Sequence, residues 1–329
     1  MTVILRLCQA QTTCRRRPTS SASALGCPKA WSSLAWQSGY RLTYEGVSLF
    51  VDPYVSRVPL RALLLRRTAL PDGQMIARYL NAPGEVAGVL VGHTHFDHAV
   101  DAPALARRYA VEVAVHRPYE LGPFVVRFVP SRHSKLLFGR KVPRDGPLTC
   151  DHLDRVNPVA YKCGPVYGIR IEVAGISMYH QGSADLDDAE LPAEPVDVFL
   201  AGVAGRQVTA RYWERVLPRL DPRFVVPTHY DNFFSPLGRQ RDVVRKVALA
   251  DVPDESTAWP AAPGSPRCRA STPDQARREF SRRCASRDRV CPKPVAGFQP
   301  KGRLSGQRRR ASRHPFLPSS ARPSHGGTR

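Results

Sequence analysis

The chain of 329 residues lacks any long apolar run. A membrane-spanning helix needs about 20 apolar residues in succession, whereas the longest candidates, such as 88–91 and 196–203, have the length of a strand. Proline is frequent, with 31 residues, which argues against a helical bundle and for many turns. We therefore expect no membrane partner and a fold rich in strands and loops.

Cysteine pairs with metal-binding spacing are also missing. Of the eight cysteines, only Cys150 and Cys163 lie within residues 39–238. No CxxC pair occurs, which argues against a structural zinc ribbon. Cys150 and Cys163 are either a disulfide or two free thiols, and thiols in a reducing cytoplasm are the simpler interpretation.

The N-terminal segment contains Arg15-Arg16-Arg17 upstream of Cys27, which loosely resembles a twin-arginine lipoprotein signal. The intervening stretch 20–26 is rich in Ser and Ala and contains one Leu. The hydrophobic region that such a signal needs is therefore missing. We expect the protein to be cytoplasmic.

The net charge of +21 is unevenly distributed along the chain. Residues 1–38 hold 5 Lys or Arg and no acid, and residues 239–329 hold 21 Lys or Arg against 7 acids, so the ends contribute +5 and +14. Residues 39–238 hold 23 against 21, which leaves +2. A basic surface attracts phosphates, but this nearly balanced middle counts against nucleic acid as the partner.

Both ends also lack hydrophobic periodicity. We predict a disordered leader over 1–38 and a disordered basic tail, rich in Arg, Pro and Ser, over 239–329, because neither can bury enough apolar surface to offset chain entropy. The tail is either an arm for nucleic acid or a membrane surface, or the product of an incorrect reading frame or gene boundary. The abrupt change of composition favours the second origin.

Between these ends, strand and helix patterns are interspersed. An apolar–polar alternation predicts a hairpin of 40–44 with 47–51, which ends at Asp52-Pro53. Mixed sheets packed by helices are the architecture that the whole pattern favours. Further strands are predicted at 86–91, 111–115, 124–129, 166–173, 176–179, 196–201 and 224–226, and helices at 71–80, 99–109 and 209–220.

The segment His93-Thr94-His95-Phe96-Asp97-His98 places four ligand-type side chains within six residues, on a polar loop that follows a buried strand. In a loop, the side chains of His93 and His95 can point in the same direction, while those of Asp97 and His98 point to a second position nearby. One short segment can then hold two cations close together. Imidazole nitrogen and carboxylate oxygen suit Zn²⁺ best, and similar ligands accept Mn or Fe.

This HxHxDH segment resembles the signature of the metallo-β-lactamase superfamily. The likeness covers roughly residues 39–237, including the opening hairpin, its terminal Asp-Pro, and isolated histidines after later strands. It is closest to the branch of metal-dependent hydrolases that includes ascorbate-phosphate lactonase-like proteins. The resemblance implies an α+β fold, an αββα sandwich of two mixed β-sheets flanked by helices, with two metal ions at one edge.

The resemblance also implies the ligands of the first metal. His93 and His95 would bind it together with a later histidine. His133, which directly follows the strand 124–129, is the best candidate for that histidine. His116 is the rival, and an ordinary surface role suits it better.

For the second metal, the resemblance implies Asp97, His98 and a final histidine, assigned to His229 after the last strand. It also implies an aspartate that bridges both metals, soon after a Gly. Ser183 stands at that position, so we assign the bridge to Asp185, two residues later. The alternative for Asp185 is a carboxylate at a helix N-terminus.

The polar stretch 135–157 is long enough for a functional lid. Its basic side chains either form a solvated face, which is the commoner case, or attract an anionic substrate. We interpret Cys150-Asp151-His152 in this loop as substrate-side or surface residues rather than metal ligands. The basic side chains are Lys135, Arg140, Lys141 and Arg144.

These ligands predict a hydrolase. Two metal ions lower the pKa of a shared water from about 15.7 towards ~7 and polarise the oxygen under attack. We therefore expect metal-bound hydroxide to cleave an ester, lactone or related bond in a small molecule, with Asp97 orienting the nucleophile and accepting its proton. Two alternatives stay open: a nucleic-acid phosphodiesterase of the ribonuclease Z type, and a non-catalytic, damaged family member.

Overall fold

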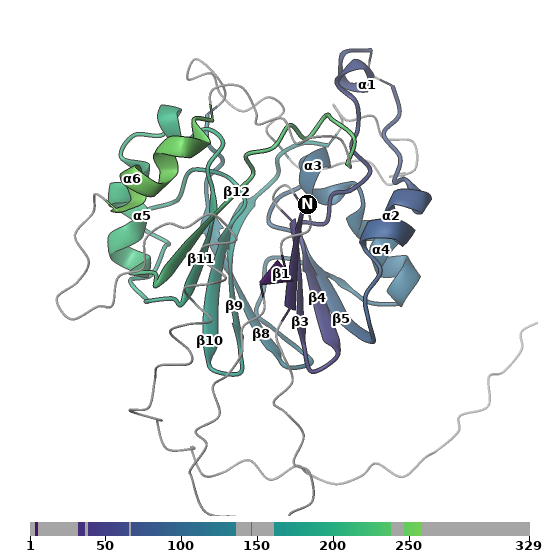
Figure 1. Ribbon diagram of the computed structural model, residues 1–329, viewed down its shortest axis with the longest axis horizontal. Coiled ribbons are helices and arrows are strands. Elements are labelled where there is room, and N and C mark those ends of the chain that lie inside the picture. The colour runs from purple at the N-terminus through teal and green to yellow at the C-terminus, as the bar shows by residue number, and fades with distance from the viewer. Residues whose placement is uncertain are drawn as a thin grey trace, which may run out of the picture. The chain divides into compact units, whose positions relative to one another are not determined.

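Six strands form the first sheet, in the spatial order β1-β2-β3-β4-β5-β6 (Figure 1). The computed structural model describes residues 4–5, 32–36, 39–65, 67–135, 146, 161–237 and 247–257. Neighbours from β1 to β4 are antiparallel, while β4, β5 and β6 run parallel. The strands are β1 (Ile4–Leu5), β2 (Ser32–Trp36), β3 (Gly39–Tyr44), β4 (Val47–Val51), β5 (Glu85–Leu90) and β6 (Val113–Ala114).

The second sheet also has six strands, in the order β12-β11-β10-β9-β8-β7. Neighbours from β7 to β10 are antiparallel, and β10, β11 and β12 run parallel. Both sheets are therefore mixed. The strands are β7 (Tyr119–Leu121), β8 (Phe124–Ser131), β9 (Val166–Val173), β10 (Ile176–Gln181), β11 (Val198–Gly202) and β12 (Phe224–Thr228).

Helices lie on the outer side of each sheet (Figure 1). Beside the first sheet are α1 (Leu60–Leu64), α2 (Gly73–Tyr79), α3 (Phe96–Ala99) and α4 (Ala102–Tyr109), and beside the second are α5 (Tyr212–Leu220) and α6 (Val252–Thr257). Short 3-10 turns occupy Arg206–Val208 and Leu249–Asp251. The predicted α+β sandwich, two mixed sheets between helices, is confirmed.

Strand alternation divides the apolar side chains among three buried layers. In β4, Leu49 and Val51 face the second sheet, whereas Phe50 between them packs towards the helices of the first sheet. In the fully buried β11, Leu200 joins the layer between the sheets and Phe199 packs with the layer around α5. Successive side chains of a strand point to opposite faces of the sheet, which makes this division possible. The packing on both faces holds the strands in place, and with them the polar loops at their ends.

The folded part of the chain extends beyond both predicted boundaries. At the N-terminal side, β2 pairs with β3 inside the leader predicted for 1–38, because backbone pairing at a sheet edge requires no apolar alternation. At the other side, Val247 and Val252 are buried against α5, and Arg206 Nε lies 2.6 Å from Glu255 Oε2. Described secondary structure thus also lies outside the predicted domain boundaries at 39 and 238, which stay predictions, while residues 258–329 lie outside the described residues.

Other elements differ locally from the expectation. The loop predicted over 92–98 contains α3, and β7 and α1 were not predicted.

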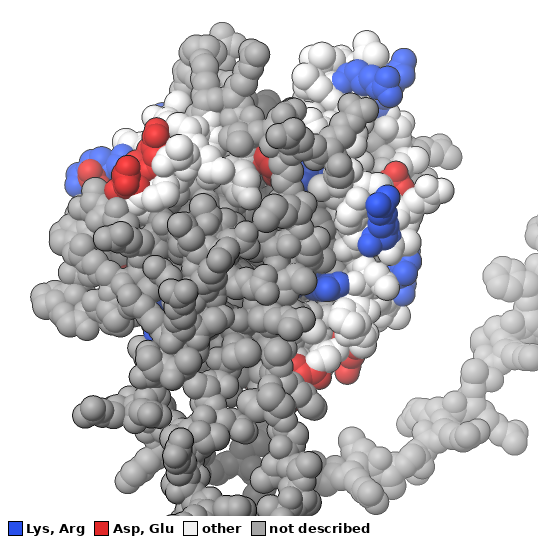
Figure 2. All heavy atoms as spheres, viewed as in Figure 1, with Lys and Arg blue, Asp and Glu red and all other residues white. Residues whose placement is uncertain are grey.

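None of the described helices has the length and hydropathy needed to span a membrane. On the face shown in Figure 2, the described surface carries basic and acidic side chains in small groups, and at the upper left the two kinds lie together.

Candidate metal centre

The predicted ligands are delivered to one edge of the sandwich by strands from both sheets. His93 follows β5, His133 follows β8 and His229 follows β12. The two sheets are tied together at this edge, where the Tyr167 N–H donates to the Gly92 carbonyl at 2.9 Å. Residues far apart in the chain therefore converge because their strands end at the same place.

The first cluster consists of His93, His95 and His133, each with a ring nitrogen within 4.8 Å of the others'. The His93 Nε2 and His95 Nδ1 atoms lie 3.2 Å apart. The ring of His133 lies 5.0 Å from that of His93 and 4.7 Å from that of His95, centroid to centroid. His133 Nδ1 donates to the Ser134 carbonyl at 2.7 Å, and since a carbonyl only accepts, Nε2 keeps its lone pair for a ligand.

The second cluster consists of Asp97, His98 and His229, again within 4.8 Å of one another. Asp97 Oδ2 lies 3.3 Å from His229 Nε2 and 3.7 Å from His98 Nε2. Asp97 and His98 belong to α3, so one short helix places both beside the strand-end His229. The rings of His93 and His98 are 3.9 Å apart, which makes the two clusters direct neighbours.

Asp52, at the end of β4, is a buried carboxylate that the sequence did not reveal as part of the site. Its Oδ2 accepts from His98 Nδ1 and from His180 Nε2, both at 2.9 Å, and its Oδ1 accepts from the Gly92 N–H at 2.7 Å. An ionised carboxylate only accepts, so His98 carries its proton on Nδ1. In a neutral His98, this tautomer leaves the lone pair on Nε2, which lies 3.7 Å from Asp97 Oδ2 in the second cluster.

Burial and repulsion from neighbouring histidines favour the uncharged forms of His93 and His133. Burial, followed by the neighbouring histidines, holds the pKa of His93 well below its usual value. Burial and the nearby His95 lower the pKa of His133 to about 3. Neutral imidazole is the form that binds metal ions. Within the first cluster, His93 and His133 are thus neutral imidazoles near neutral pH.

The second cluster carries charge instead. Burial alone would raise the pKa of Asp97, but His98 and His229 outweigh burial and lower it. Burial likewise lowers the pKa of His98, while Asp52 and Asp97 outweigh it and raise the pKa overall. Asp97 is therefore a carboxylate at neutral pH, available as an anionic ligand.

The donor set fits metal ions. Five imidazoles and one carboxylate, in two groups of three, match the nitrogen and oxygen ligands of zinc and similar transition metals. The Nδ1 atom of His229 is buried and makes no hydrogen bond within the part of the chain that the structure describes. Burial of a polar atom without a partner costs free energy, so His229 is held at this strand end at a cost to stability.

The structure does not bring Asp185 into either cluster. Its Oδ1 accepts from Arg215 at 3.1 Å and from the Leu186 N–H at 2.8 Å, and no helix of the described residues begins here, so the alternative role at a helix N-terminus is not seen either. The assignment of Asp185 as the bridge is corrected accordingly. His116 is likewise absent from the clusters, and its ring lies against that of Tyr167 at 4.7 Å.

The predicted lid, 135–157, falls outside the described residues except for Lys135 and Gly146. Cys150-Asp151-His152 is among the residues not described. Cys163, in contrast, is buried beside the metal-binding loop. The Thr94 N–H donates to the Cys163 carbonyl at 3.1 Å, and the Thr94 hydroxyl donates to the Lys162 carbonyl at 2.5 Å. Residues 161–164 therefore hold Thr94 in place between His93 and His95.

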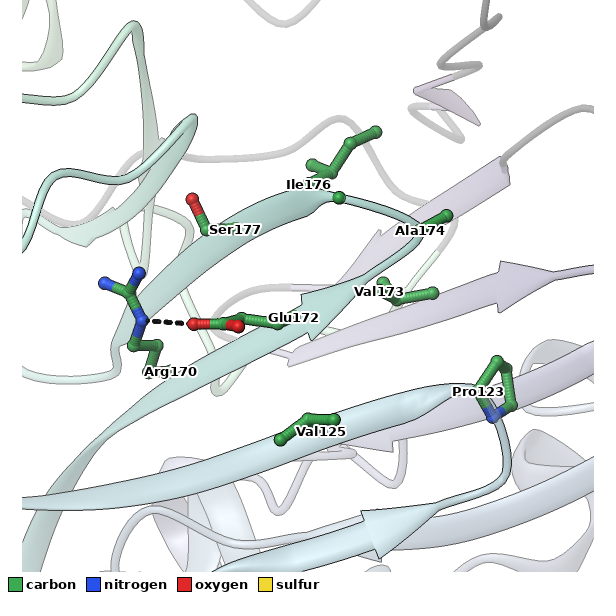
Figure 3. Close-up of a pocket in the computed structure, with 9 residues that line it drawn as sticks. Pro123, Val125, Arg170, Glu172, Val173, Ala174, Ile176 and Ser177 are labelled. Carbon is green, nitrogen blue, oxygen red and sulfur yellow. Dashed lines mark hydrogen bonds and ion pairs between the residues drawn. The ribbon is translucent and has the colours of Figure 1, made fainter. Parts of the chain in front are cut away.

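A surface pocket of about 350 Å³ lies at the β9–β10 turn (Figure 3). Its polar side chains include Arg170 and Glu172, which form an ion pair at 2.8 Å. β9 begins next to Tyr167, near the clusters, and β10 runs back towards them, so this turn is at the far end of both strands. The pocket is thus separate from the candidate metal centre.

The chain is similar in sequence to known proteins. The family model of the "Beta-lactamase superfamily domain" matches residues 35–229. A "UPF0173 metal-dependent hydrolase" of Carboxydothermus hydrogenoformans is 27% identical over 218 residues, which cover 63% of this chain and 88% of that protein. A protein of the same name from a Polaromonas species is 29% identical over 247 residues, or 65% of this chain and 81% of the relative.

Among solved structures, a novel metallo hydrolase from Ignicoccus hospitalis, Igni18, is 18% identical, with a TM-score of 0.39 over 72% of this chain and 92% of that one. The family match covers more than half of this chain and spans every member of both clusters. The chain therefore belongs to the β-lactamase superfamily domain family and is a metal-dependent hydrolase.

Proposed function

We propose that this chain uses two metal ions to hydrolyse an ester, lactone or related bond in a small molecule in the cytoplasm. Zinc is the metal that we propose for both positions. The observation that carries the proposal is the contact between the clusters, with the rings of His93 and His98 only 3.9 Å apart. Two adjacent cations can act on a single reacting group. The first cluster consists of imidazoles and the second contains a carboxylate, so the two clusters offer different ligands to the two ions.

When bound, the metal ions lower the pKa of water and polarise the bond under attack. The protein residues supply position and proton transfer. Asp97 is ionised and lies between His98 and His229, where its carboxylate can orient the attacking water and accept its proton. Asp52 holds the ring of His98 in position by accepting a hydrogen bond from its Nδ1 atom. The half-buried ring of Phe233 lies beside that of His229, at 5.7 Å between centroids.

The charges of the described residues support a small molecule rather than a nucleic acid. Binding to phosphate backbones requires basic side chains that are not already neutralised. Here Arg57 pairs with Asp231 at 2.8 Å and Arg132 pairs with Asp187 at 2.9 Å. Arg215 pairs with acidic side chains as well. With a net charge of only +2 over 39–238, we place the basicity of the chain outside the site.

The experiment compares Asp97→Asn with wild type on ester, lactone and phosphodiester probes, at equal zinc occupancy. Asparagine keeps the size of the side chain and removes the charge and proton acceptance. We expect the rate to fall by about 10²–10⁴-fold. Asp187→Asn, which alters an exposed ion pair with Arg132, should leave the rate unchanged.

Near-wild-type activity of Asp97→Asn at full occupancy would contradict the proposed mechanism. Turnover of the phosphodiester alone would favour the ribonuclease Z-type alternative. A wild type that binds two metal ions and turns over no probe would favour the non-catalytic alternative.

A further inference from the structure

The ligands of the second cluster come from two separate elements. Asp97 and His98 belong to α3, whereas His229 begins the loop that follows β12. The backbone of His229 has a φ of 56°, in the left-handed region. That conformation costs free energy in residues other than glycine, and it persists only where neighbouring contacts hold it. The position of His229 opposite α3 therefore depends on what holds the loop 229–234.

The segment 53–58, which follows β4, contacts this loop. Arg57 Nη2 lies 2.8 Å from Asp231 Oδ2, two residues after the ligand. The Tyr54 hydroxyl donates to the Phe233 carbonyl at 3.1 Å. Two side chains of one segment thus hold the loop that begins with the ligand.

The same segment is anchored at the end of α3. Asp101, which is buried, lies directly between α3 and α4. Its Oδ2 accepts from the Val55 N–H at 2.7 Å and from the Ser56 N–H at 2.9 Å. Segment 53–58 therefore connects the helix that carries two ligands to the loop that carries the third.

The ion pair of Arg57 with Asp231 is the charged contact in this connection. The two side chains expose only 3% and 7% of their surface. Asp231 Oδ1 makes no hydrogen bond within the described part of the chain. Removal of one partner of a buried pair leaves the other charge buried and unpaired. Without Arg57, the loop would therefore gain by moving so that water reaches the carboxylate.

Aromatic packing also joins α3 to the loop. The ring of Phe96 lies 6.1 Å from those of Phe233 and Phe234, centroid to centroid. Burial of apolar surface is not directional, so this packing can keep the loop near α3 without fixing the orientation of the ligand. A hydrogen bond between charged groups is directional. The ion pair is therefore the contact suited to orient the loop.

We propose that Arg57 is a positioning residue for the second metal ion, which keeps His229 opposite the ligands of α3 by holding Asp231. This inference rests on the proposed two-metal site. The first cluster takes no ligand from the loop 229–234, so its affinity for metal should not depend on Arg57.

The test measures the zinc affinity of each cluster separately, by competition with a chromophoric chelator in the full-length chain. His93→Ala leaves only the second cluster complete, and His229→Ala leaves only the first. In the His93→Ala chain, Arg57→Met should weaken zinc binding by about 10–100-fold, the usual scale for groups that orient metal ligands. In the His229→Ala chain, it should leave zinc binding unchanged. Asp231→Asn should act in the same direction, and the pair of substitutions should weaken binding less than the two single effects added together, because both act through one contact.

Two further variants separate positioning from general stability. Arg57→Lys keeps the charge and should restore part of the affinity that Arg57→Met loses. Arg223→Met removes an arginine–aspartate pair at the other end of β12, where Arg223 Nη1 lies 2.9 Å from Asp197 Oδ1. It should lower the unfolding free energy without changing zinc binding by either cluster.

Circular dichroism of the metal-free variants checks that each one folds. If Arg57→Met does not fold, Asp231→Asn in the same two chains decides the question. Unchanged affinity of the second cluster, equal weakening of both clusters, or the same weakening by Arg223→Met would overturn the proposal. Weakening confined to the second cluster, in a protein whose wild type turns over no probe, would support this inference and contradict the proposed hydrolytic function. A wild type that binds no zinc would overturn both.

Discussion

The Asp52 carboxylate and the His98 imidazole meet across the edge of the sandwich, with His98 Nδ1 donating to Asp52 Oδ2 at 2.9 Å and both side chains buried. This pair joins the end of β4 to α3, and His180 from the second sheet donates to the same oxygen. One carboxylate thus sets the orientation of a ligand and links the two sheets at the site.

Asp52→Asn tests this relationship. Asparagine retains the shape of the side chain but loses the charge that holds His98 with its proton on Nδ1. We expect zinc affinity of the second cluster to fall by about 10–100-fold, while the first cluster keeps its ion. Competition with a chromophoric chelator measures both steps. Equal weakening of both steps, or none, would show that Asp52 does not act through His98.

Asp185→Asn tests the corrected role of Asp185. Because its carboxylate pairs with Arg215 rather than with the clusters, zinc content should not change. The loss of a partly buried ion pair should cost about 1 kcal/mol or less of unfolding free energy. Elemental analysis and urea unfolding give the two values. Loss of one zinc equivalent would restore Asp185 as a ligand.

Val252→Ala tests whether the fold continues past residue 238. Val252 is fully buried in the layer around α5, so its truncation should lower the unfolding free energy by about 1–3 kcal/mol. A chain that ends at 257 should likewise be more stable than one that ends at 238. Leu65→Ala, at a leucine that is 61% exposed, is the control and should change stability by no more than about 0.5 kcal/mol. Equal stability of the two truncated chains would place the boundary at 238 after all.

The metal-free protein should lose stability in acid partly through His133. Its folded-state pKa is about 3, below the usual 6.5, so between these pH values the unfolded chain binds more protons and stability falls as pH drops. His98, with a raised pKa, has the opposite sign and contributes stability that is lost as pH rises through that value. His133→Gln removes only the first contribution, so its urea-unfolding free energy should vary less between pH 6.5 and pH 4. An unchanged pH dependence would contradict the burial of a neutral His133.

Local patterns were sufficient to predict much of this fold. The alternation around Glu45-Gly46 predicted the hairpin of β3 and β4, and the apolar run before His93 predicted β5. In contrast, β2 forms by pairing with β3, and within 247–256 only Val247 and Val252 are buried. Neither leaves a periodic pattern in the sequence.

The residues of the site also fall into those that local patterns predict and those that depend on contacts between distant parts of the chain. The HxHxDH segment and the strand-end histidines were visible because each follows a predicted strand. Asp52 was visible only as part of a turn after β4, since its partner His180 is 128 residues away in the chain and in the other sheet. Asp185 was assigned to the site because it is close to Gly182 in the sequence. That proximity did not place its carboxylate in either cluster.

The central claim is that His93, His95 and His133 hold one metal ion and that Asp97, His98 and His229 hold another. The most direct test is elemental analysis of the full-length chain, reconstituted at saturating free zinc and then separated from unbound metal in the same zinc buffer. We expect about two zinc equivalents per chain, about one in His93→Ala and in His229→Ala, and an unchanged content in His116→Ala. Absence of bound transition metal from the wild type, or loss of an equivalent in His116→Ala, would contradict the account.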